Sequence, residues 1–145
     1  MPTSRRHLML ALAALALAIP PALQAQPAGP AKPHRVVIQV SDADPAKWNL
    51  ALNNASNIQQ DLGGDQVAIE IVAYGPGIGL LKLESVAGAR VAEALAAGIT
   101  VQACENTMRN QKLVREDMLP KFGYVPSGVV QLMKRQKEGW AYIRP

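Results

Sequence analysis

Residues 35–64, RVVIQVSDADPAKWNLALNNASNIQQDLGG, contain one complete strand–helix unit. The run 35–40 is short, apolar and β-branched, which predicts a buried strand. Asp44 is placed to cap a helix that has Pro45 at its first position. Apolar residues then recur at three- and four-residue steps until Gly63-Gly64, a pattern typical of an amphipathic helix that ends at a left-handed residue. The stretch therefore predicts a buried strand followed by an amphipathic helix.

The same alternation continues to the end of the chain. We expect strands at 67–74, 99–104, 124–125 and 140–143, and helices at about 84–97, 106–119 and 127–138. Strands separated by helical segments indicate βαβ crossovers and a mostly parallel sheet, and right-handed crossovers place helices on both of its faces. The predicted fold is therefore α/β, a three-layer α/β/α sandwich with a mostly parallel sheet of about five strands. Met108, Met118 and Met133 lie at helical spacing among apolar residues and are expected in its core.

The first 25 residues have the pattern of a secretory leader. A short basic region at 4–7 precedes an apolar run at 8–19, which is shorter than the ~20 residues of a spanning helix. We expect cleavage after Ala25, a flexible Pro/Ala/Gly-rich tether at 26–34 and one domain at 35–145, in the periplasm or secreted. The pair Arg5-Arg6 also fits a twin-arginine signal. A retained anchor helix is the alternative.

Composition narrows the classes of function. The chain has 145 residues and a net charge of +4, which falls to +2 when Arg5 and Arg6 are removed with the leader. The aromatic content of 4% is too low for a stacking single-strand binder, and nucleic acid is not expected outside the cytoplasm. Residues 109–145 carry eight basic and three acidic side chains, which we expect to be solvated helix faces, with a basic face for an anionic partner as the alternative. No spacing indicates a metal site, and no cofactor is expected.

The ligand edge of an open parallel sheet lies outside the carboxyl ends of its strands. Four segments are expected there: 41–42, 75–79, 104–107 and 126–127. The only cysteine of the chain, Cys104, falls in the third of them, just before a helix start at Asn106 and Thr107. Free backbone N–H groups and the helix dipole favour an anion at such a place, which lowers a thiol's pKa and would stabilise a thiolate or a persulfide.

The residues around Cys104 favour sulfur exchange, with a purely structural cysteine as the alternative. Arg109 is expected to add positive charge to it, whereas Glu105 opposes the thiolate if its carboxylate lies nearby. Of the two histidines, His7 lies in the leader and His34 in the tether, so no histidine is expected beside Cys104. Sulfur exchange by the thiolate itself therefore fits better than Cys–His hydrolysis. An isolated cysteine at the end of an apolar strand is equally often a small buried hydrophobic residue.

The glycine-rich segment 75–79 offers a different candidate ligand edge. GPGIG matches neither dinucleotide nor P-loop spacing, so we expect a tight turn, with ligand contact at Asp42, Gly75 and Gly77 as the alternative. Asp42 itself is expected beside a helix start rather than on a metal. The apolar residues that follow at 78, 80 and 81 would be exposed in a monomer, which favours a subunit interface over burial under the domain's own loops.

Four stretches of the chain stand out together: RVVIQVSD at 35–42, VAYGPGIGLL at 72–81, VQACENTM at 101–108 and VPSGVVQLMKRQKEGWAYIRP at 125–145. They give residues 35–143 a resemblance to the DsrE/DsrF-like proteins of sulfur relay and sulfur oxidation, in the family's order. It implies an α/β sandwich that assembles into trimers or hexamers. It also implies that Cys104 accepts sulfane sulfur as a persulfide and passes it to a partner protein's thiol, in a sulfurtransferase-like carrier. The alternative is a non-catalytic oligomeric binding or assembly module in which Cys104 is structural.

Overall fold

The computed structural model describes residues 31–145. The expected leader and most of the expected tether lie outside these residues, and His34, expected in the tether, is the first residue of a strand. The elements follow in the order β1 (His34–Val40), α1 (Pro45–Leu62), β2 (Val67–Ala73), η1 (Gly75–Leu81), α2 (Gly88–Ala96), β3 (Thr100–Cys104), α3 (Glu105–Asn110), η2 (Arg115–Asp117), β4 (Gly123–Val125), α4 (Gly128–Lys137) and β5 (Ala141–Ile143).

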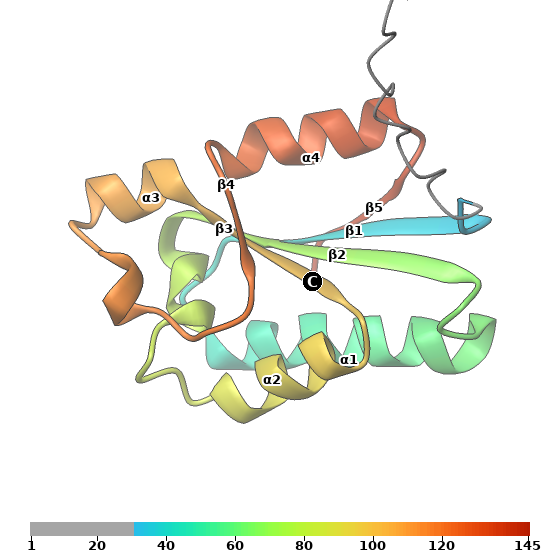
Figure 1. Ribbon diagram of the computed structural model, residues 1–145, viewed down its shortest axis with the longest axis horizontal. Helices are drawn as coiled ribbons and strands as arrows, with labels where there is room; N and C mark the ends of the chain where they lie inside the picture. Colours follow the sequence, from blue (N-terminus) through green and yellow to red (C-terminus); the bar gives the residue numbers. More distant parts are fainter. Residues whose placement is uncertain (1–30) are drawn as a thin grey trace, which may run out of the picture.

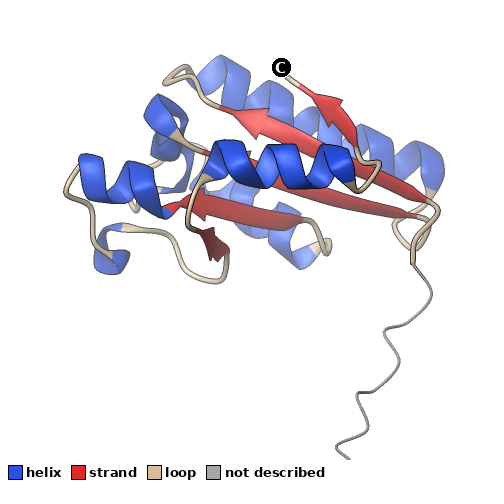
Figure 2. Cartoon of the chain, turned by 90° about the horizontal axis from the view of Figure 1, so that it is seen from above, coloured by secondary structure: helices blue, strands red, loops and turns tan. Residues whose placement is uncertain are grey.

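The five strands form one parallel sheet in the order β4-β3-β2-β1-β5. In its centre Ile38 pairs with Ile71 on one side and with Ile143 on the other. Helices α1 and α2 lie on one face of the sheet, and α3 and α4 lie toward the other (Figure 1). The layers are also seen from above in Figure 2. The predicted three-layer α/β/α sandwich with a mostly parallel sheet is confirmed.

The two faces of the sheet differ in character. The larger core lies under α1 and α2 and is almost wholly aliphatic, with Ile38, Ile71 and Val101 among its buried residues. The smaller core lies under α4 and consists of Val37, Val72 and Leu132, with Tyr74 and Trp140 packed against it. The α4 face therefore relies on polar contacts to complete its packing.

A buried carboxylate provides the strongest of these contacts. Glu70 of β2 exposes only 1% of its surface and accepts hydrogen bonds from Arg135 Nε at 2.7 Å and Gln131 Nε2 at 2.6 Å. The Arg135 guanidinium also lies 4.5 Å from the centre of the Trp140 ring and 2.9 Å from a Glu138 carboxylate oxygen. The ion pair fixes the register of α4 on the sheet, because a buried charge must keep its partner.

The first helix follows its sequence signals closely. The Asp44 carboxylate accepts a hydrogen bond from the Ala46 N–H at 2.8 Å, and Pro45 occupies the first turn. The helix ends at Gly63, whose φ of 90° is in the left-handed region that glycine adopts without strain. The predicted cap, first residue and end of this helix are confirmed.

Two other helices are shorter than predicted. The segment predicted as a turn at 75–79 is a 3-10 helix, η1, and α2 begins only at Gly88. The helix expected to reach residue 119 ends at Asn110, and Lys112 adopts a φ of 56°. The chain turns there because Leu119 must return to η1, where its N–H donates to the Leu81 carbonyl at 2.8 Å.

Two expectations about apolar side chains are wrong. Ile78, Leu80 and Leu81 are buried inside the same domain, because η1 folds them into the core, so they form no exposed interface. Met133 is exposed, since it projects from α4 on the side away from the sheet, whereas Met108 and Met118 are buried as expected. Within residues 31–145, no helix has the length and apolar content needed to cross a bilayer.

Candidate functional site: a thiol at the carboxyl edge of the sheet

The four segments expected at the carboxyl edge of the sheet are joined to one another by hydrogen bonds. The Gly77 N–H donates to the Ser41 carbonyl at 3.1 Å, and the Gly75 N–H donates to Thr107 Oγ1 at 2.8 Å. The Asn106 N–H donates to the Pro126 carbonyl at 3.2 Å. The parallel strands therefore bring together residues from four separate parts of the chain, as the sequence predicted.

Cys104 lies in the middle of this edge. It is the last residue of β3 and the N-cap of α3, and its sulfur accepts a hydrogen bond from the Thr107 N–H at 3.4 Å. The helix begins at Glu105, one residue before the expected start at Asn106, and the thiol itself takes the place of the capping oxygen. Only 4% of the Cys104 surface is exposed.

Several hydrogen-bond donors converge on the Cys104 sulfur. Burial by itself raises the pKa of a thiol, but here the Thr107 hydroxyl and the backbone N–H groups of Gly128, Thr107 and Asn106 outweigh burial and lower the pKa of Cys104. The Thr107 N–H of α3 donates to the sulfur, and the Gly128 N–H at the start of α4 is among the groups that lower its pKa. Such a site favours the thiolate over the thiol and would favour any other anion on that sulfur.

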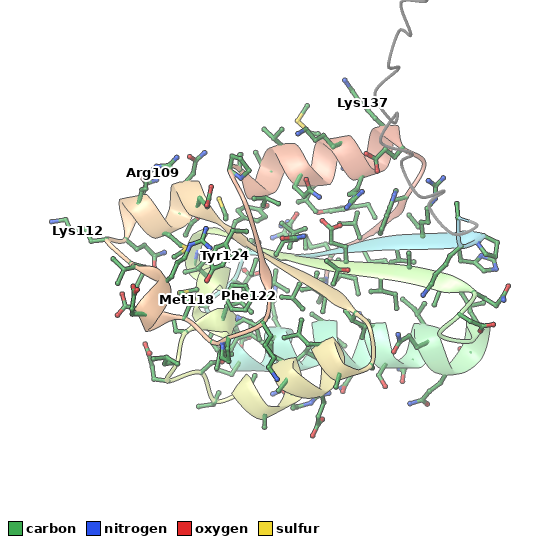
Figure 3. The ribbon with its side chains drawn as sticks, in the orientation of Figure 1. Arg109, Lys112, Met118, Phe122, Tyr124 and Lys137 are labelled. Atoms are coloured by element: carbon green, nitrogen blue, oxygen red, sulfur yellow. The ribbon has the colours of Figure 1, made fainter. Side chains whose placement is uncertain are left out.

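The predicted supporting residues Asn106, Thr107 and Arg109 differ in how close their side chains lie to the Cys104 sulfur. Thr107 is buried beside Cys104 and links it to Gly75, so its predicted role fits its position. Asn106 contributes its backbone N–H, while its side chain is exposed and accepts a hydrogen bond from Arg109. Arg109 points outward from α3 (Figure 3) and makes no hydrogen bond to the sulfur, so the positive charge expected at the thiol lies on the surface instead. The Glu105 carboxylate lies 3.4 Å from Arg115.

Sequence reasoning missed Gly128 and Tyr74. A Cβ atom on Gly128 would lie 2.9 Å from Tyr74 Cβ, so only glycine lets α4 begin this close to Tyr74. The Gly128 N–H is among the groups that lower the pKa of Cys104. Burial, with Tyr142 nearby, raises the pKa of Tyr74, so its phenol stays protonated at neutral pH. The sequence predicts the neighbouring segment 126–127 at this edge, but nothing in it singles out the next residue as a donor.

The candidate ligand edge at Asp42, Gly75 and Gly77 is occupied by contacts within the chain. The N–H groups of Gly75 and Gly77 already donate to Thr107 and Ser41, and a Cβ atom on Gly77 would lie 2.3 Å from the Val40 carbonyl oxygen. The glycines therefore allow η1 to pack against the end of β1. Asp42 lies 3.4 Å from Lys47 in an exposed ion pair.

Two hollows lie along the same edge. At the switch point between β1 and β5, where an open α/β sheet commonly binds its ligand, the hollow has a volume of only about 10 Å³. A larger, open hollow of about 350 Å³ lies beside α3, where Arg115 stacks 4.0 Å from the centre of the Tyr124 ring. Among residues 31–145, no three His, Cys, Asp or Glu side chains are grouped so as to hold a metal ion.

Comparison with known proteins places the chain beside structures of unassigned function. No family model matches the sequence, and no curated protein matches it. BT1422 from Bacteroides thetaiotaomicron, a conserved protein of unknown function, is 19% identical with a TM-score of 0.60 over 77% of this chain and 94% of its own. The ychN protein from E. coli is 10% identical with a TM-score of 0.60 over 77% and 99%. These two likenesses show the fold.

A third structure is a closer relative. MTH1491 from Methanobacterium thermoautotrophicum, a protein of unknown function, is 38% identical to this chain, with a TM-score of 0.74. The match covers 77% of this chain and 99% of MTH1491, so it includes essentially the whole of that protein. The chain belongs to the same protein family as MTH1491.

Proposed function

We propose that this protein is an exported DsrE/DsrF-like sulfur carrier that takes sulfane sulfur as a persulfide on Cys104. The observation that supports this role is the setting of the Cys104 sulfur. The Thr107 N–H donates to the sulfur at 3.4 Å, and the Thr107 hydroxyl and the N–H groups of Gly128 and Asn106 also lower its pKa. These donors stabilise an anion at that position, and a sulfur carrier needs an anion there both before and after it is loaded. The sequence resemblance to the DsrE/DsrF-like proteins supports the same role.

The loading step is a thiol–disulfide type exchange. The Cys104 thiolate attacks the outer sulfur of a persulfide or polysulfide donor, and a new S–S bond forms on Cys104. The S–S bond of the donor breaks, and the inner sulfur of the donor leaves as a thiolate with the electron pair. The persulfide on Cys104 then passes its outer sulfur to an acceptor thiolate by the same exchange. The lowered pKa of Cys104 favours the thiolate that attacks, so the exchange does not require a histidine beside it.

The test is the mass of the protein after exposure to a donor. A small inorganic donor suits the site, because Cys104 is 4% exposed. Incubation with sodium polysulfide should add about 32 Da, one sulfur atom, to the intact chain, and dithiothreitol should remove it. Cys104→Ser should take up nothing, Thr107→Ser should load like the wild type, and Thr107→Val should load more slowly.

The opposite result would support the alternative function. If the thiol stays free of added sulfur while denatured protein under the same conditions reacts, Cys104 is a structural residue. Its burial and its place as the N-cap of α3 favour that alternative, a non-catalytic binding or assembly module. In that case Cys104→Ser would leave assembly and partner binding unchanged.

Export and assembly belong to the same proposal. Cell fractionation should find the chain in the periplasm, shortened at its N-terminus by the leader. Light scattering should give the mass of a trimer or a hexamer, as the family resemblance implies. Leu83 and Val86 are exposed in the loop before α2 and are candidates for the subunit contact. A monomer by light scattering would contradict the proposed assembly without bearing on the chemistry of Cys104.

A further inference from the structure

We propose that the outward sides of α3 and α4 form a docking surface for a protein that presents apolar side chains surrounded by acidic ones. The surface consists of Val129, Val130 and Met133 of α4, with four basic residues around them that are described below. The inference rests on the proposed function, because the partner in question would be the protein that gives sulfur to Cys104 or takes sulfur from it.

The apolar part of this docking surface is unusual for the outer side of a helix. Val129, Val130 and Met133 are 52%, 43% and 54% exposed, whereas Leu132 on the inner side is buried against the sheet. The three side chains follow one another within two turns, so they form one continuous patch. A surface helix normally carries polar residues on that side. An exposed apolar patch of this kind marks a contact with another molecule.

The charged residues of these two helix segments are mainly basic. Arg109 extends from α3, Lys112 from the turn that follows it, and Lys137 from the last turn of α4 (Figure 3). None of these residues, nor Lys134, forms an ion pair with any residue of the described part of the chain, 31–145. Four free positive charges attract an acidic partner and speed its approach.

The acids of the same two helix segments do not cancel this charge. Glu105 lies 3.4 Å from Arg115, and Glu138, next to the end of α4, lies 2.9 Å from Arg135. Arg115 matches Glu105, whereas Arg135 is shared between Glu138 and the buried Glu70, so one unmatched negative charge stands against the four free cations. The docking surface therefore keeps its excess of positive charge, which is complementary to carboxylates on a partner.

The docking surface adjoins the thiol. The two helices begin near each other, since the Asn106 N–H donates to the Pro126 carbonyl at 3.2 Å, and from there they extend in opposite directions along the same side of the sheet (Figure 1). The first residue of α4, Gly128, supplies an N–H to the Cys104 sulfur. A protein held on the docking surface would therefore lie over the edge of the sheet at which sulfur must enter and leave.

A second copy of the chain and a membrane both fit the docking surface less well than an acidic protein does. A second copy that paired through the same surface would place basic residues opposite basic residues, which is unfavourable. A membrane is a poor fit because α4 already uses its main apolar side against the sheet and offers only three apolar side chains outward. An acidic protein surface is complementary to both the apolar patch and the charges.

The experiment uses two synthetic helical peptides as probes. Both carry leucine at i, i+3, i+4 and i+7, with glutamate at the flanking positions of one and lysine at those of the other. Binding to the ¹⁵N-labelled full chain is followed by NMR at low and at high salt. We expect the glutamate peptide to shift the amide signals of α3 and α4 and to bind at least tenfold more tightly than the lysine peptide, with the difference reduced at high salt.

Variants test the surface directly. Lys134→Glu/Lys137→Glu should weaken the glutamate peptide at least tenfold, and Met133→Gln should weaken both peptides. Lys47→Glu/Lys121→Glu makes the same change of net charge elsewhere and should bind as the wild type does. Binding should persist in Cys104→Ser. Loss of persulfide formation with intact peptide binding would refute the sulfur-carrier role and leave a binding surface, whereas normal persulfide formation without peptide binding would refute the docking surface.

Three results would overturn the inference. The first is equal binding of the two peptides, which would mean that charge does not select the partner. The second is a shift of signals from another face of the molecule. The third is a different occupant of the docking surface. This would be a second copy if self-association protected the α4 amides from hydrogen exchange, or a membrane if α4 bound phosphatidylglycerol vesicles while the glutamate peptide did not bind.

Discussion

Replacing Arg135 with methionine should destabilise the fold more than its place on a surface helix suggests. The substitution keeps much of the aliphatic stem but leaves the Glu70 carboxylate, 1% exposed, with Gln131 as its remaining side-chain partner. Breaking a buried pair from one side costs about 3–5 kcal/mol, because a charge stays buried without compensation. Arg135 is 27% exposed, so water can reach part of the site and the loss should be near the lower limit, about 3 kcal/mol.

Urea unfolding followed by circular dichroism measures this loss. With a slope of about 1.5 kcal/mol per molar urea, a loss of about 3 kcal/mol lowers the midpoint by about 2 M. The double variant Glu70→Leu/Arg135→Met should recover most of the loss, since it removes the buried charge as well as its partner. Glu138→Gln, which removes only the exposed partner of Arg135, should cost less than about 1 kcal/mol.

The reasoning is refuted by either of two outcomes. A loss below about 1 kcal/mol for Arg135→Met would mean that Glu70 does not depend on this arginine. A double variant at least as unstable as the single one would mean that the loss comes from packing of the arginine stem and not from the unpaired carboxylate.

Two further predictions concern the site and the segment beside it. The rate of Cys104 alkylation by iodoacetamide should have its pH midpoint below that of an ordinary cysteine, because the thiolate persists until the pH falls through the lowered pKa. Thr107→Val should move this midpoint upward, whereas Thr107→Ser should leave it unchanged. Gly77→Ala should cost about 3 kcal/mol or more in urea unfolding, because its Cβ atom would lie 2.3 Å from the Val40 carbonyl oxygen. Gly64→Ala, whose Cβ atom meets nothing closer than 3.8 Å, should change stability by less than about 0.5 kcal/mol, and similar losses at the two glycines would contradict the packing argument.

Local sequence signals were sufficient wherever a segment's own chemistry fixes its structure. The Asp44 cap, Pro45 and Gly63 set both ends of α1, and the β-branched runs set β1, β2 and β3. The parallel sheet and its carboxyl edge followed from the alternation of strands and helices. The position of Cys104 at that edge could therefore be predicted before the structure was considered.

Local signals failed where a distant contact overrides helix propensity. The helix that begins at Glu105 stops early because residues 118 and 119 are needed against η1, which is far away in sequence. The Ile78–Leu81 stretch looked exposed because its burial depends on how η1 folds over the core. Met133 looked buried because helical spacing alone does not say which side of α4 faces the sheet.

The sequence by itself determined the fold class, the order of its strands and helices along the chain, and the edge at which its single cysteine would lie. These follow from short-range periodicity and from the geometry of parallel sheets, which depend on residue type and spacing. Only the tertiary structure decided which groups surround that cysteine. Gly128, 24 positions further along the chain, helps to lower its pKa and has no side chain to collide with Tyr74, while Arg109, five positions away, turns outward. The hydrogen bonds that lower the thiol's pKa depend on the close packing of two helix starts, and packing of that kind is set by the whole domain at once.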